Sequence, residues 1–367
     1  MSPHPLFIGN EIFRDTPFSK RHPLAIPRVS AATDLVRALG WLDAARYRDS
    51  PCASAADLAR FHDPAYIAAV IAAEACQTMT PEAARRFNIG AIEAPIYPTM
   101  FKRPATAAGA SLLAADLVAE AGIVFSPASG THHGRRARAS GFCFFNDPVL
   151  GLLRLLDGGL ERIFYLDIDA HHGDGVEAAF ADDARVFTLS VHEAGRWPGT
   201  GLVDDRAGGM ARNLPVPAGY NDSEMTYLLE NAILPLVARF RPQAIMIQCG
   251  ADALAEDPLS KLALSNASHR RVVAAVMPLC SRLIVTGGGG YNPWAVARCW
   301  AGVWGVLNGF DVPDRLPAAA EAVLRGIAWQ RSPGRDPPAH WFTTLADAPR
   351  AGPVRPEIRA LARAVIA

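Results

Sequence analysis

The stretch RIFYLDIDAHHGDG, residues 162–175, joins an apolar run to a cluster of acidic residues and histidines. Its aliphatic and aromatic side chains predict a buried strand over 162–168. Similar runs predict four more strands, at 123–126, 186–191, 244–249 and 282–286. Helical patterns accompany them, at 104–119, 147–156, 222–240, 267–280 and 293–307. This alternation is typical of an α/β fold with a mainly parallel sheet and helices on both faces.

The segments on either side of this alternating region have a different character. The first hundred residues are predicted to be helical and rich in loops, because prolines interrupt them repeatedly. The segment 330–353 is rich in proline, but it is too short and too apolar in places to separate two cores. We therefore expect residues 1–367 to form one domain, with a core at about 15–310 and a C-terminal extension, 311–367, packed on it.

The composition excludes several classes of protein. The 367 residues are 50% hydrophobic, and 36 Lys and Arg balance 36 Asp and Glu. That balance disfavours a surface that coats nucleic acid. No uncharged apolar stretch approaches the roughly 20 residues that span a bilayer, and the N-terminal residues lack a secretory signal pattern. We expect a cytoplasmic protein whose 6 scattered cysteines stay reduced.

Polar side chains follow four of the predicted strands. His132 and His133 come after the first, Asp252 after the fourth, and the glycine run 287–290 with Tyr291 after the fifth. In open α/β sheets, ligands bind outside the carboxyl ends of the strands. We therefore expect these groups to meet the Asp and His residues that end the second strand.

The end of the second strand predicts a metal site. Asp167, Asp169 and His171 are spaced two apart, so on a strand they would project from one face. A calcium-binding EF-hand loop counted from Asp167 would need glycine and glutamate where this chain has His172 and Ala178. Two carboxylates and one imidazole suit a borderline divalent ion, with zinc the first choice and iron, cobalt or manganese the alternatives.

The adjacent histidines His132 and His133 are poorly arranged to bind one ion from the same direction, so we interpret them as general bases. Each then needs a carboxylate on its other ring nitrogen, and Asp167 and Asp174 are available. His172 points away on a strand-like path and is predicted to be structural. Tyr291 is expected at the edge of the pocket, as a donor to a carbonyl oxygen that becomes negative.

Five motifs, in this order, resemble those of the histone deacetylase family: GTHHGRRARASGFCFFND (130–147), YLDIDAHHGDGVEAAF (165–180), WPGTG (197–201), QCGADALAEDPL (248–259) and TGGGGYNPWAVARCW (286–300). They are most similar to the bacterial acetoin-utilization deacetylases, close to the class I enzymes. The resemblance implies a single arginase–deacetylase α/β domain with a parallel sheet of about eight strands. It also implies a zinc-dependent hydrolase that removes acetyl or other short acyl groups from the ε-amine of lysine in proteins or peptides.

The same resemblance implies two metal sites. The implied ligands of one zinc ion are Asp169, His171 and Asp252. A potassium ion beside it would be held, partly through backbone carbonyls, by Asp167, Asp169, His171, Ser190 and Val191.

The resemblance also implies catalytic roles. His133 becomes the general base and acid for a metal-activated water, and His132 its electrostatic partner. Tyr291 becomes the donor that polarises the carbonyl. Asp167 and Asp174 become the carboxylates behind the two histidines.

A tunnel for the acyl-lysine is implied as well, and its lining residues would be Gly141, Phe142, Trp197, Leu264 and Gly289. Arg28 matches an arginine that lines an internal acetate channel. Class I enzymes carry an aspartate that grips the substrate backbone, and Pro98 in APIYPTMF (94–101) stands there in this chain. Thr131 stands where bulkier residues are common. We therefore expect a weak grip on any defined peptide, and a pocket floor open to acyl groups larger than acetyl.

Three other functions remain open. An acetylpolyamine amidohydrolase would perform the same chemistry on a small acylated amine. An arginase-like ureohydrolase shares the pattern DAHHGD (169–174) but needs a second aspartate two residues after Asp252, where Leu254 stands. A metal-stabilised binding protein is disfavoured because every reactive position is filled.

Overall fold

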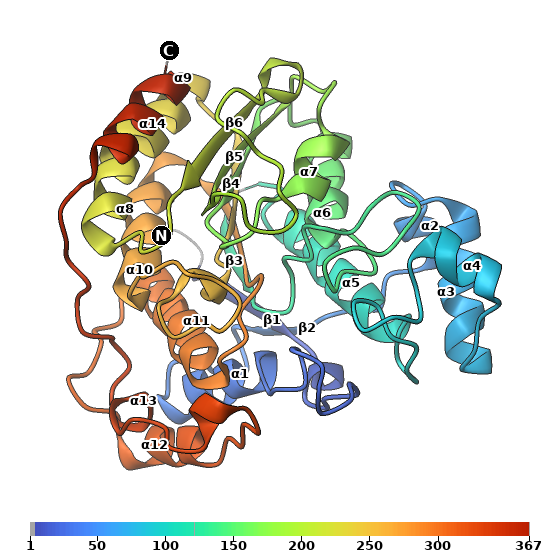
Figure 1. Cartoon of the computed structure of the whole chain (residues 1–367), viewed down its shortest axis with the longest axis horizontal. Helices are drawn as coiled ribbons and strands as arrows, with labels where there is room; N and C mark the ends of the chain where they lie inside the picture. The colour runs from blue at the N-terminus through green and yellow to red at the C-terminus, as the bar shows by residue number, and fades with distance from the viewer. Residues whose placement is uncertain (1–3, 121, 367) are drawn as a thin grey trace.

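One eight-stranded sheet runs through the molecule in the order β2-β1-β3-β8-β7-β4-β5-β6, and its neighbouring strands are parallel. The computed structural model describes residues 4–120 and 122–366 (Figure 1). The strands are β1 (Leu6–Gly9), β2 (Tyr47–Asp49), β3 (Gly122–Ser126), β4 (Ile163–Asp167), β5 (Val186–Glu193), β6 (Ala211–Val216), β7 (Ala244–Gln248) and β8 (Arg282–Thr286).

The five strands predicted from the sequence are confirmed as β3, β4, β5, β7 and β8. The N-terminal region is helical and rich in loops, as predicted, but it also contains β1 and β2, which the sequence analysis did not identify. These strands have four and three residues, too few to show a repeating pattern. β6 was also missed, because it contains Pro215; an edge strand tolerates this proline.

Helices cover both faces of the sheet (Figure 1). One face carries α5 (Lys102–Leu117), α6 (Asp147–Asp157) and α7 (Asp174–Ala179). The other carries α1 (Val29–Ala38), α8 (Asp222–Leu228), α9 (Leu234–Phe240), α10 (Asn266–Val276) and α11 (Pro293–Asn308). The predicted helix 222–240 is α8 and α9 joined by a π-helical turn, Leu229–Ile233. Among the described residues, no helix has the length and apolar character needed to cross a bilayer.

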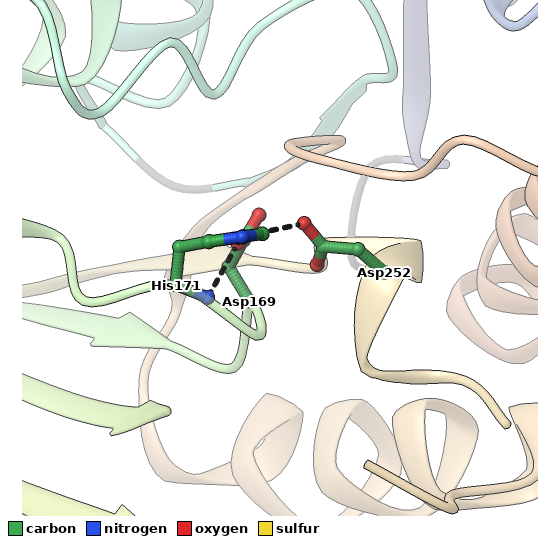
Figure 2. A group of neighbouring side chains, drawn as sticks. All are labelled: Asp169, His171 and Asp252. Atoms are coloured by element: carbon green, nitrogen blue, oxygen red, sulfur yellow. Dashed lines mark hydrogen bonds and ion pairs between the residues drawn. The ribbon is translucent and has the colours of Figure 1, made fainter. Parts of the chain in front are cut away.

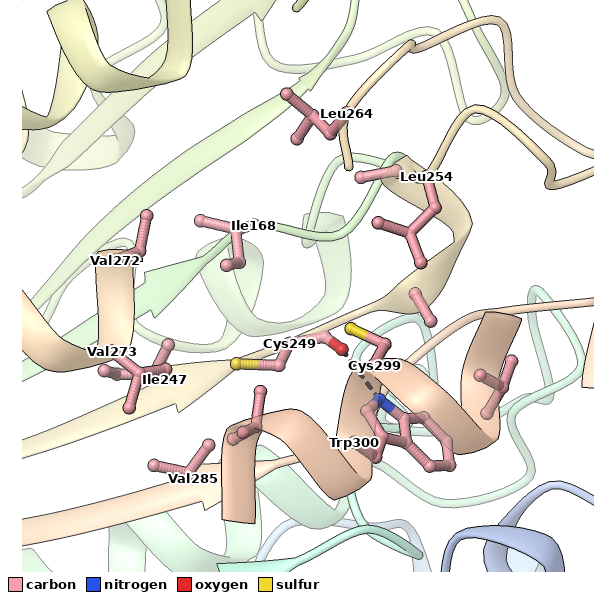
Figure 3. Close-up of a cluster of buried hydrophobic side chains, with 14 of the residues drawn as sticks. Ile168, Ile247, Cys249, Leu254, Leu264, Val272, Val273, Val285, Cys299 and Trp300 are labelled. Atoms are coloured by element: carbon pink, nitrogen blue, oxygen red, sulfur yellow. Dashed lines mark hydrogen bonds between the residues drawn. The ribbon is translucent and has the colours of Figure 1, made fainter. Parts of the chain in front are cut away.

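The strand β4 shows how the sheet builds two cores. Phe164 and Leu166 lie in the larger core, with α1 and α8–α11, whereas Ile163 and Tyr165 lie in the core beneath α5 and α6. Figure 3 shows part of the larger core, where the indole N–H of Trp300 donates to the Cys249 carbonyl at 2.9 Å. Because both faces are buried, the central strands are apolar until their carboxyl ends.

Two peripheral regions pack on this core. The short helices α2 (Ala55–Leu58), α3 (Pro64–Cys76) and α4 (Pro81–Phe87) form a smaller cluster of their own with the segment 144–150. The C-terminal region contributes α12 (Ala318–Arg325), α13 (His340–Thr343) and α14 (Pro356–Ile366). Trp329 and Trp341 of this region pack against Trp294 of α11. The C-terminal region is therefore part of the larger core as far as the described residues extend, and residue 367 lies outside them.

Candidate active site

The polar groups expected to converge do so at the carboxyl ends of the strands. Residues that follow β3, β4, β7 and β8 line one pocket of about 60 Å³. Its polar lining residues include His132, His133, Asp169, His171, Asp252 and Tyr291. Four segments far apart in the sequence therefore form one site.

Asp169, His171 and Asp252 form a group with the geometry of metal ligands. Their candidate ligand atoms lie within 4.8 Å of one another. Figure 2 shows the His171 ring beside both carboxylates, with Nδ1 2.9 Å from Asp252 Oδ2 and 3.3 Å from Asp169 Oδ1. Asp169 is only 1% exposed and Asp252 is 0% exposed. Two buried carboxylates this close repel each other, and a divalent cation between them would relieve that repulsion.

A turn after β4, rather than the alternation of side chains along a strand, positions Asp169 and His171. β4 ends at Asp167, so Asp169 and His171 lie beyond it, and the strand predicted over 162–168 was one residue too long at each end. Asp167 Oδ1 accepts the backbone N–H of Asp169 at 3.1 Å, and Asp169 Oδ1 accepts that of His171 at 2.9 Å. Asp252 Oδ1 accepts the N–H of Ala170 at 2.9 Å. The carboxylates of Asp167, Asp169 and Asp252 therefore stabilise the turn after β4 by accepting its backbone N–H groups.

The glycine run fits against the same carboxylates. The backbone N–H of Gly289 donates to Asp169 Oδ2 at 2.7 Å, and a Cβ on Gly289 would overlap the Asp252 carboxylate. Gly288 and Gly290 have φ values of 122° and 137°, which residues with side chains rarely adopt. Glycine is therefore required both by the close approach and by the backbone turn.

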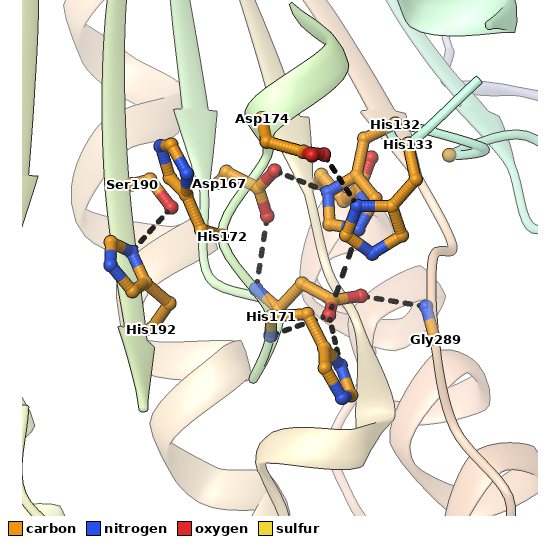
Figure 4. A network of polar contacts seen from close by, with 12 residues as sticks. His132, His133, Asp167, His171, His172, Asp174, Ser190, His192 and Gly289 are labelled. Carbon is orange, nitrogen blue, oxygen red and sulfur yellow. Dashed lines mark hydrogen bonds and ion pairs between the residues drawn. The ribbon is translucent and has the colours of Figure 1, made fainter. Parts of the chain in front are cut away.

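The two adjacent histidines each contact the carboxylate predicted for them (Figure 4). His132 Nδ1 lies 2.7 Å from Asp167 Oδ2, and His133 Nδ1 lies 2.8 Å from Asp174 Oδ1. The two imidazole rings are 3.9 Å apart between centroids. With Nδ1 of His133 committed to Asp174, Nε2 is the ring nitrogen left to exchange a proton.

The protonation of the two rings is set in opposite directions. Burial and the neighbouring charge of His132 lower the pKa of His133 to about 3. Burial also disfavours charge on His132, but Asp167 and Asp169 outweigh it and raise the pKa of His132 to about 9. At neutral pH, His133 is therefore an uncharged imidazole able to accept a proton, and His132 keeps its proton.

Tyr291 faces the pocket from the end of the glycine run. Its backbone N–H donates to Asp257 Oδ2 at 2.6 Å, and its ring meets Phe142 edge-on at 5.9 Å between centroids. Burial raises the pKa of Tyr291 well above its usual value. The phenol therefore keeps its proton at neutral pH and is available as a hydrogen-bond donor.

The residues assigned to the tunnel do not all lie together. Gly141 and Phe142 line the pocket, and Trp197 stands at its rim, 47% exposed, with its ring 4.7 Å from that of His133. Leu264 is 1% exposed within the larger core and does not line the pocket. Its assignment as a substrate-binding residue is therefore corrected: its apolar side chain fills the core.

The expectation about Pro98 also requires correction. Pro98 is exposed, and the acidic group beside the pocket is Glu93, whose Oε1 accepts the backbone N–H of Gly141 at 2.5 Å. This side of the pocket therefore does carry an acceptor. The loop between α4 and α5 has no periodic pattern from which to fix the register, so the sequence did not identify Glu93 as the residue next to Gly141.

Several supporting residues had no role in the sequence analysis. Asp147 is buried and accepts the backbone N–H groups of Gly130 at 3.0 Å and Thr131 at 2.7 Å. Asn146 Nδ2 donates to the carbonyl of His132 at 3.0 Å. His62 Nε2 accepts the N–H of Asn146 at 2.9 Å. The sequence Asn-Asp-Pro at 146–148 predicts the start of a helix. It does not predict that the Asn and Asp side chains also hold the loop that carries the two histidines.

Two residues near the site have their polar atoms engaged in local contacts. His172 Nδ1 lies 2.8 Å from Thr200 Oγ1 and its Nε2 lies 3.2 Å from Glu177 Oε2, in keeping with a structural role. Ser190 of β5 pairs in register with Asp167 of β4, and its hydroxyl lies 2.9 Å from His192 Nδ1.

Comparisons with known proteins agree with this geometry. A sequence profile described as "Histone deacetylase domain" matches residues 22–307. "Putative histone deacetylase 2" of Caenorhabditis elegans is 37% identical over 312 residues, covering 83% of this chain and 61% of that longer protein. "Acetoin utilization protein AcuC" of Bacillus subtilis (strain 168) is 31% identical over 367 residues, covering 96% of this chain and 93% of that protein.

Solved structures match over the whole chain. The crystal structure of an HDAC homolog from Aquifex aeolicus has a TM-score of 0.94 and 34% identity, with 100% of both chains covered. A crystal structure of an HDAC homolog complexed with SAHA matches with the same TM-score, identity and coverage.

Proposed function

The chain belongs to the histone deacetylase family, and from this premise we propose that it hydrolyses acetyl or other short acyl groups from the ε-amine of lysine in proteins or peptides. One observation carries the proposal. Three side chains grouped as candidate metal ligands, a neutral histidine paired with a carboxylate, and a protonated tyrosine all line one pocket. These are the parts that metal-assisted amide hydrolysis needs.

The three ligands suit zinc. Two carboxylates and one imidazole are donors that zinc accepts, and three protein ligands leave a coordination position open. When bound there, zinc supplies a Lewis acid for the substrate carbonyl and for water. Backbone N–H groups of Ala170 and Gly289 orient the carboxylates of Asp252 and Asp169. We propose one zinc ion per chain.

We assign both proton transfers of the reaction to His133. As a neutral base it takes a proton from the attacking water, and it later returns that proton to the leaving amine. Asp174 fixes the ring through Nδ1 and stabilises the imidazolium that forms between these steps. Tyr291 donates to the carbonyl oxygen as negative charge develops there, while the proton held on His132 adds a positive charge nearby.

The pocket's walls favour a linear substrate. Phe142 and Trp197 offer aromatic surface to a lysine stem, and Gly141 leaves room beside the ring of His133. Glu93, next to Gly141, provides an acceptor for a substrate N–H group. That same carboxylate favours a second candidate, hydrolysis of an acylated small amine carrying positive charge.

We also propose a potassium ion beside the zinc, bound by Asp167, Asp169, His171, Ser190 and Val191. The register of β4 and β5 pairs Asp167 with Ser190, which supports this grouping. Carbonyl and carboxylate oxygens are suitable donors for such a cation.

Zinc-loaded protein incubated with acetyl-lysine peptides and with acetylpolyamines tests the proposal. We expect peptide hydrolysis, and no hydrolysis by Asp252→Asn protein, which lacks a metal ligand. Preference for acetylpolyamines would favour the second candidate. Release of urea from a guanidine substrate, or tight peptide binding without hydrolysis at full metal occupancy, would contradict the proposal.

A further inference from the structure

A second cavity adjoins the metal pocket. It has a volume of about 110 Å³, several times the roughly 10–15 Å³ that one water molecule needs. The residues that line both cavities are Leu24, Arg28, Ala128, Thr131 and Phe142. These shared lining residues place the chamber directly beside the metal pocket.

Most of the chamber wall is apolar. Phe13, Phe18, Ile26, Val29 and Phe144 all contribute to it. At its boundary with the metal pocket, the Thr131 hydroxyl donates to the carbonyl of Phe145 at 2.6 Å, so this side chain is fixed in place. Such a wall suits the methylene groups of a chain longer than acetyl.

Two arginines also line the chamber, and no carboxylate of the described residues is in direct contact with either; Asp252, Asp169 and Asp257 act on the charge of Arg28 only from farther away. Among the described residues, Arg28 bonds to the carbonyl of Gly288, and its Nε has no partner. Arg103 donates to the carbonyls of Ile12 at 2.5 Å, Asp15 at 3.0 Å and Phe13 at 3.4 Å. Neither guanidinium forms a salt bridge within the described part of the chain. Buried cations are ordinarily paired with an anion in direct contact, and neither guanidinium has such a partner among the described residues.

The titration of these groups is consistent with that interpretation. Burial lowers the pKa of Arg103 to about 10, and the charge of Arg28 contributes in the same direction. Burial likewise lowers the pKa of Arg28. Tyr97, whose phenol is a further hydrogen-bond donor, lines the same chamber. A bound carboxylate would meet two guanidinium groups and a hydroxyl.

We propose that this chamber receives the terminal carboxylate of a dicarboxylic acyl group, such as succinyl or glutaryl, on the substrate amine. The methylenes would lie against the apolar wall, and the carboxylate would bind Arg28 and Arg103. Water attacks the amide carbonyl, the C–N bond breaks, a C–O bond forms, and the products are the free amine and a dicarboxylate. This inference rests on the proposed function and specifies the acyl group that the site accepts.

The test compares the zinc-loaded protein on one peptide carrying acetyl-, butyryl- or succinyl-lysine. Butyryl and succinyl have the same number of carbons, so their kcat/KM ratio isolates the carboxylate. We expect succinyl to be hydrolysed at least as efficiently as butyryl. Arg103→Met, which keeps an apolar stem, should lower the succinyl-to-butyryl ratio about tenfold or more, and Arg103→Lys should preserve most of it.

A measurement on the wild type alone covers the case in which Arg103→Met fails to fold. Free succinate should inhibit acetyl-lysine hydrolysis at lower concentration than butyrate does. A succinyl peptide hydrolysed a hundredfold less efficiently than butyryl, or a ratio unchanged by Arg103→Met, would overturn this inference. If Arg103→Met slows only acetyl hydrolysis, the chamber serves product exit, and the inference is equally wrong. Hydrolysis of no acyl-lysine peptide at all would instead refute the proposed function.

Discussion

His133 lies in surroundings very different from those of an exposed histidine. It is buried, uncharged at neutral pH, and held by Asp174 through one ring nitrogen. We predict that His133→Ala loses roughly 100-fold or more in turnover, because it removes the base that carries the proton from water to the amine. Steady-state hydrolysis of an acetyl-lysine peptide measures this.

The matched control is His340→Ala, which removes a histidine whose side chain is 48% exposed and does not line the pocket. It should retain wild-type turnover. Equal activity of His133→Ala and His340→Ala, with the same zinc content, would refute the role of His133.

At the scale of single residues, roles that belong to a recognisable motif can be predicted from the sequence. Contacts that depend on how a loop is aligned against the pocket cannot. Both His–Asp pairs could be foreseen, because an imidazole that works as a base needs a carboxylate behind it. Glu93 could not be foreseen, since nothing in the sequence of its loop fixes which residue approaches Gly141. Leu264 was misassigned because a leucine offers no polar signal that distinguishes core from pocket.

The start of α6 is the element that holds the catalytic loop. Asp147 accepts the backbone N–H groups of Gly130 and Thr131. Asp147→Ala leaves these buried donors without an acceptor, so we predict that it lowers the free energy of unfolding by about 3 kcal/mol or more. Urea unfolding measures this cost. The control is Asp157→Ala at the other end of α6, which breaks an exposed pair with Arg60 and should cost under about 1 kcal/mol. Equal costs for the two variants would contradict this account.

His62 joins the α2–α3 connection to the same loop and makes its stability depend on pH. Its Nδ1 lies 3.0 Å from the Arg135 carbonyl and Nε2 accepts from Asn146, so the ring must be neutral. Burial lowers the pKa of His62 from 6.5 to about 4. The unfolded chain therefore binds this proton first, and the contribution of His62, complete above pH 6.5, is lost as pH falls toward 4.

We predict that the loss amounts to about 3 kcal/mol across this window. His62→Gln keeps a neutral acceptor and donor. Between pH 6.5 and 4, its free energy of unfolding should therefore fall by about 3 kcal/mol less than that of the wild type. Denaturant titrations of metal-free protein at several pH values measure both. Parallel pH profiles for the two proteins would show that His62 does not titrate as described.

At the scale of elements, long patterned strands and helices are predictable, and short edge strands are not. β4, β7 and β8 are buried on both faces and read as continuous apolar runs. β1, β2 and β6 lie at or near the edges of the sheet. β1 and β2 have too few residues to show an apolar pattern, and a proline interrupts the pattern of β6. Pairing of β2 with β1, of β1 with β3 and of β6 with β5, rather than local sequence, stabilises these strands.

For the whole molecule, one bound metal should stabilise the fold. Three ligands come from segments that follow β4 and β7, so metal binding holds these two strand ends together. At a free zinc concentration 100 times the Kd, we predict a gain of about 2.7 kcal/mol and a higher Tm. Thermal melts with zinc and with a chelator, alongside elemental analysis, measure this. Asp252→Asn should show no such gain, and two metals per chain would support the ureohydrolase alternative.

The location of the site was predictable because parallel strands place their carboxyl ends along one edge. Four polar clusters with no local relation to each other had to meet there. The chamber behind the pocket was not predictable as a shape, because residues from the N-terminal region, α5 and the segment 128–144 enclose it together. Only the tertiary fold brings Arg28 and Arg103 to the same cavity.

The central claim is that the pocket stabilises the transition state of amide hydrolysis rather than merely binding a metal and a peptide. Tyr291→Phe tests it most directly, because the change keeps the ring against Phe142 and removes only the hydroxyl. The measurement is single-turnover deacetylation of an acetyl-lysine peptide by zinc-loaded wild type and variant, with the peptide affinity of each. We predict a loss of about 10²–10³ in rate with nearly unchanged affinity. An equally fast variant, or one that is slow only because it binds the peptide a hundredfold more weakly, would contradict the account.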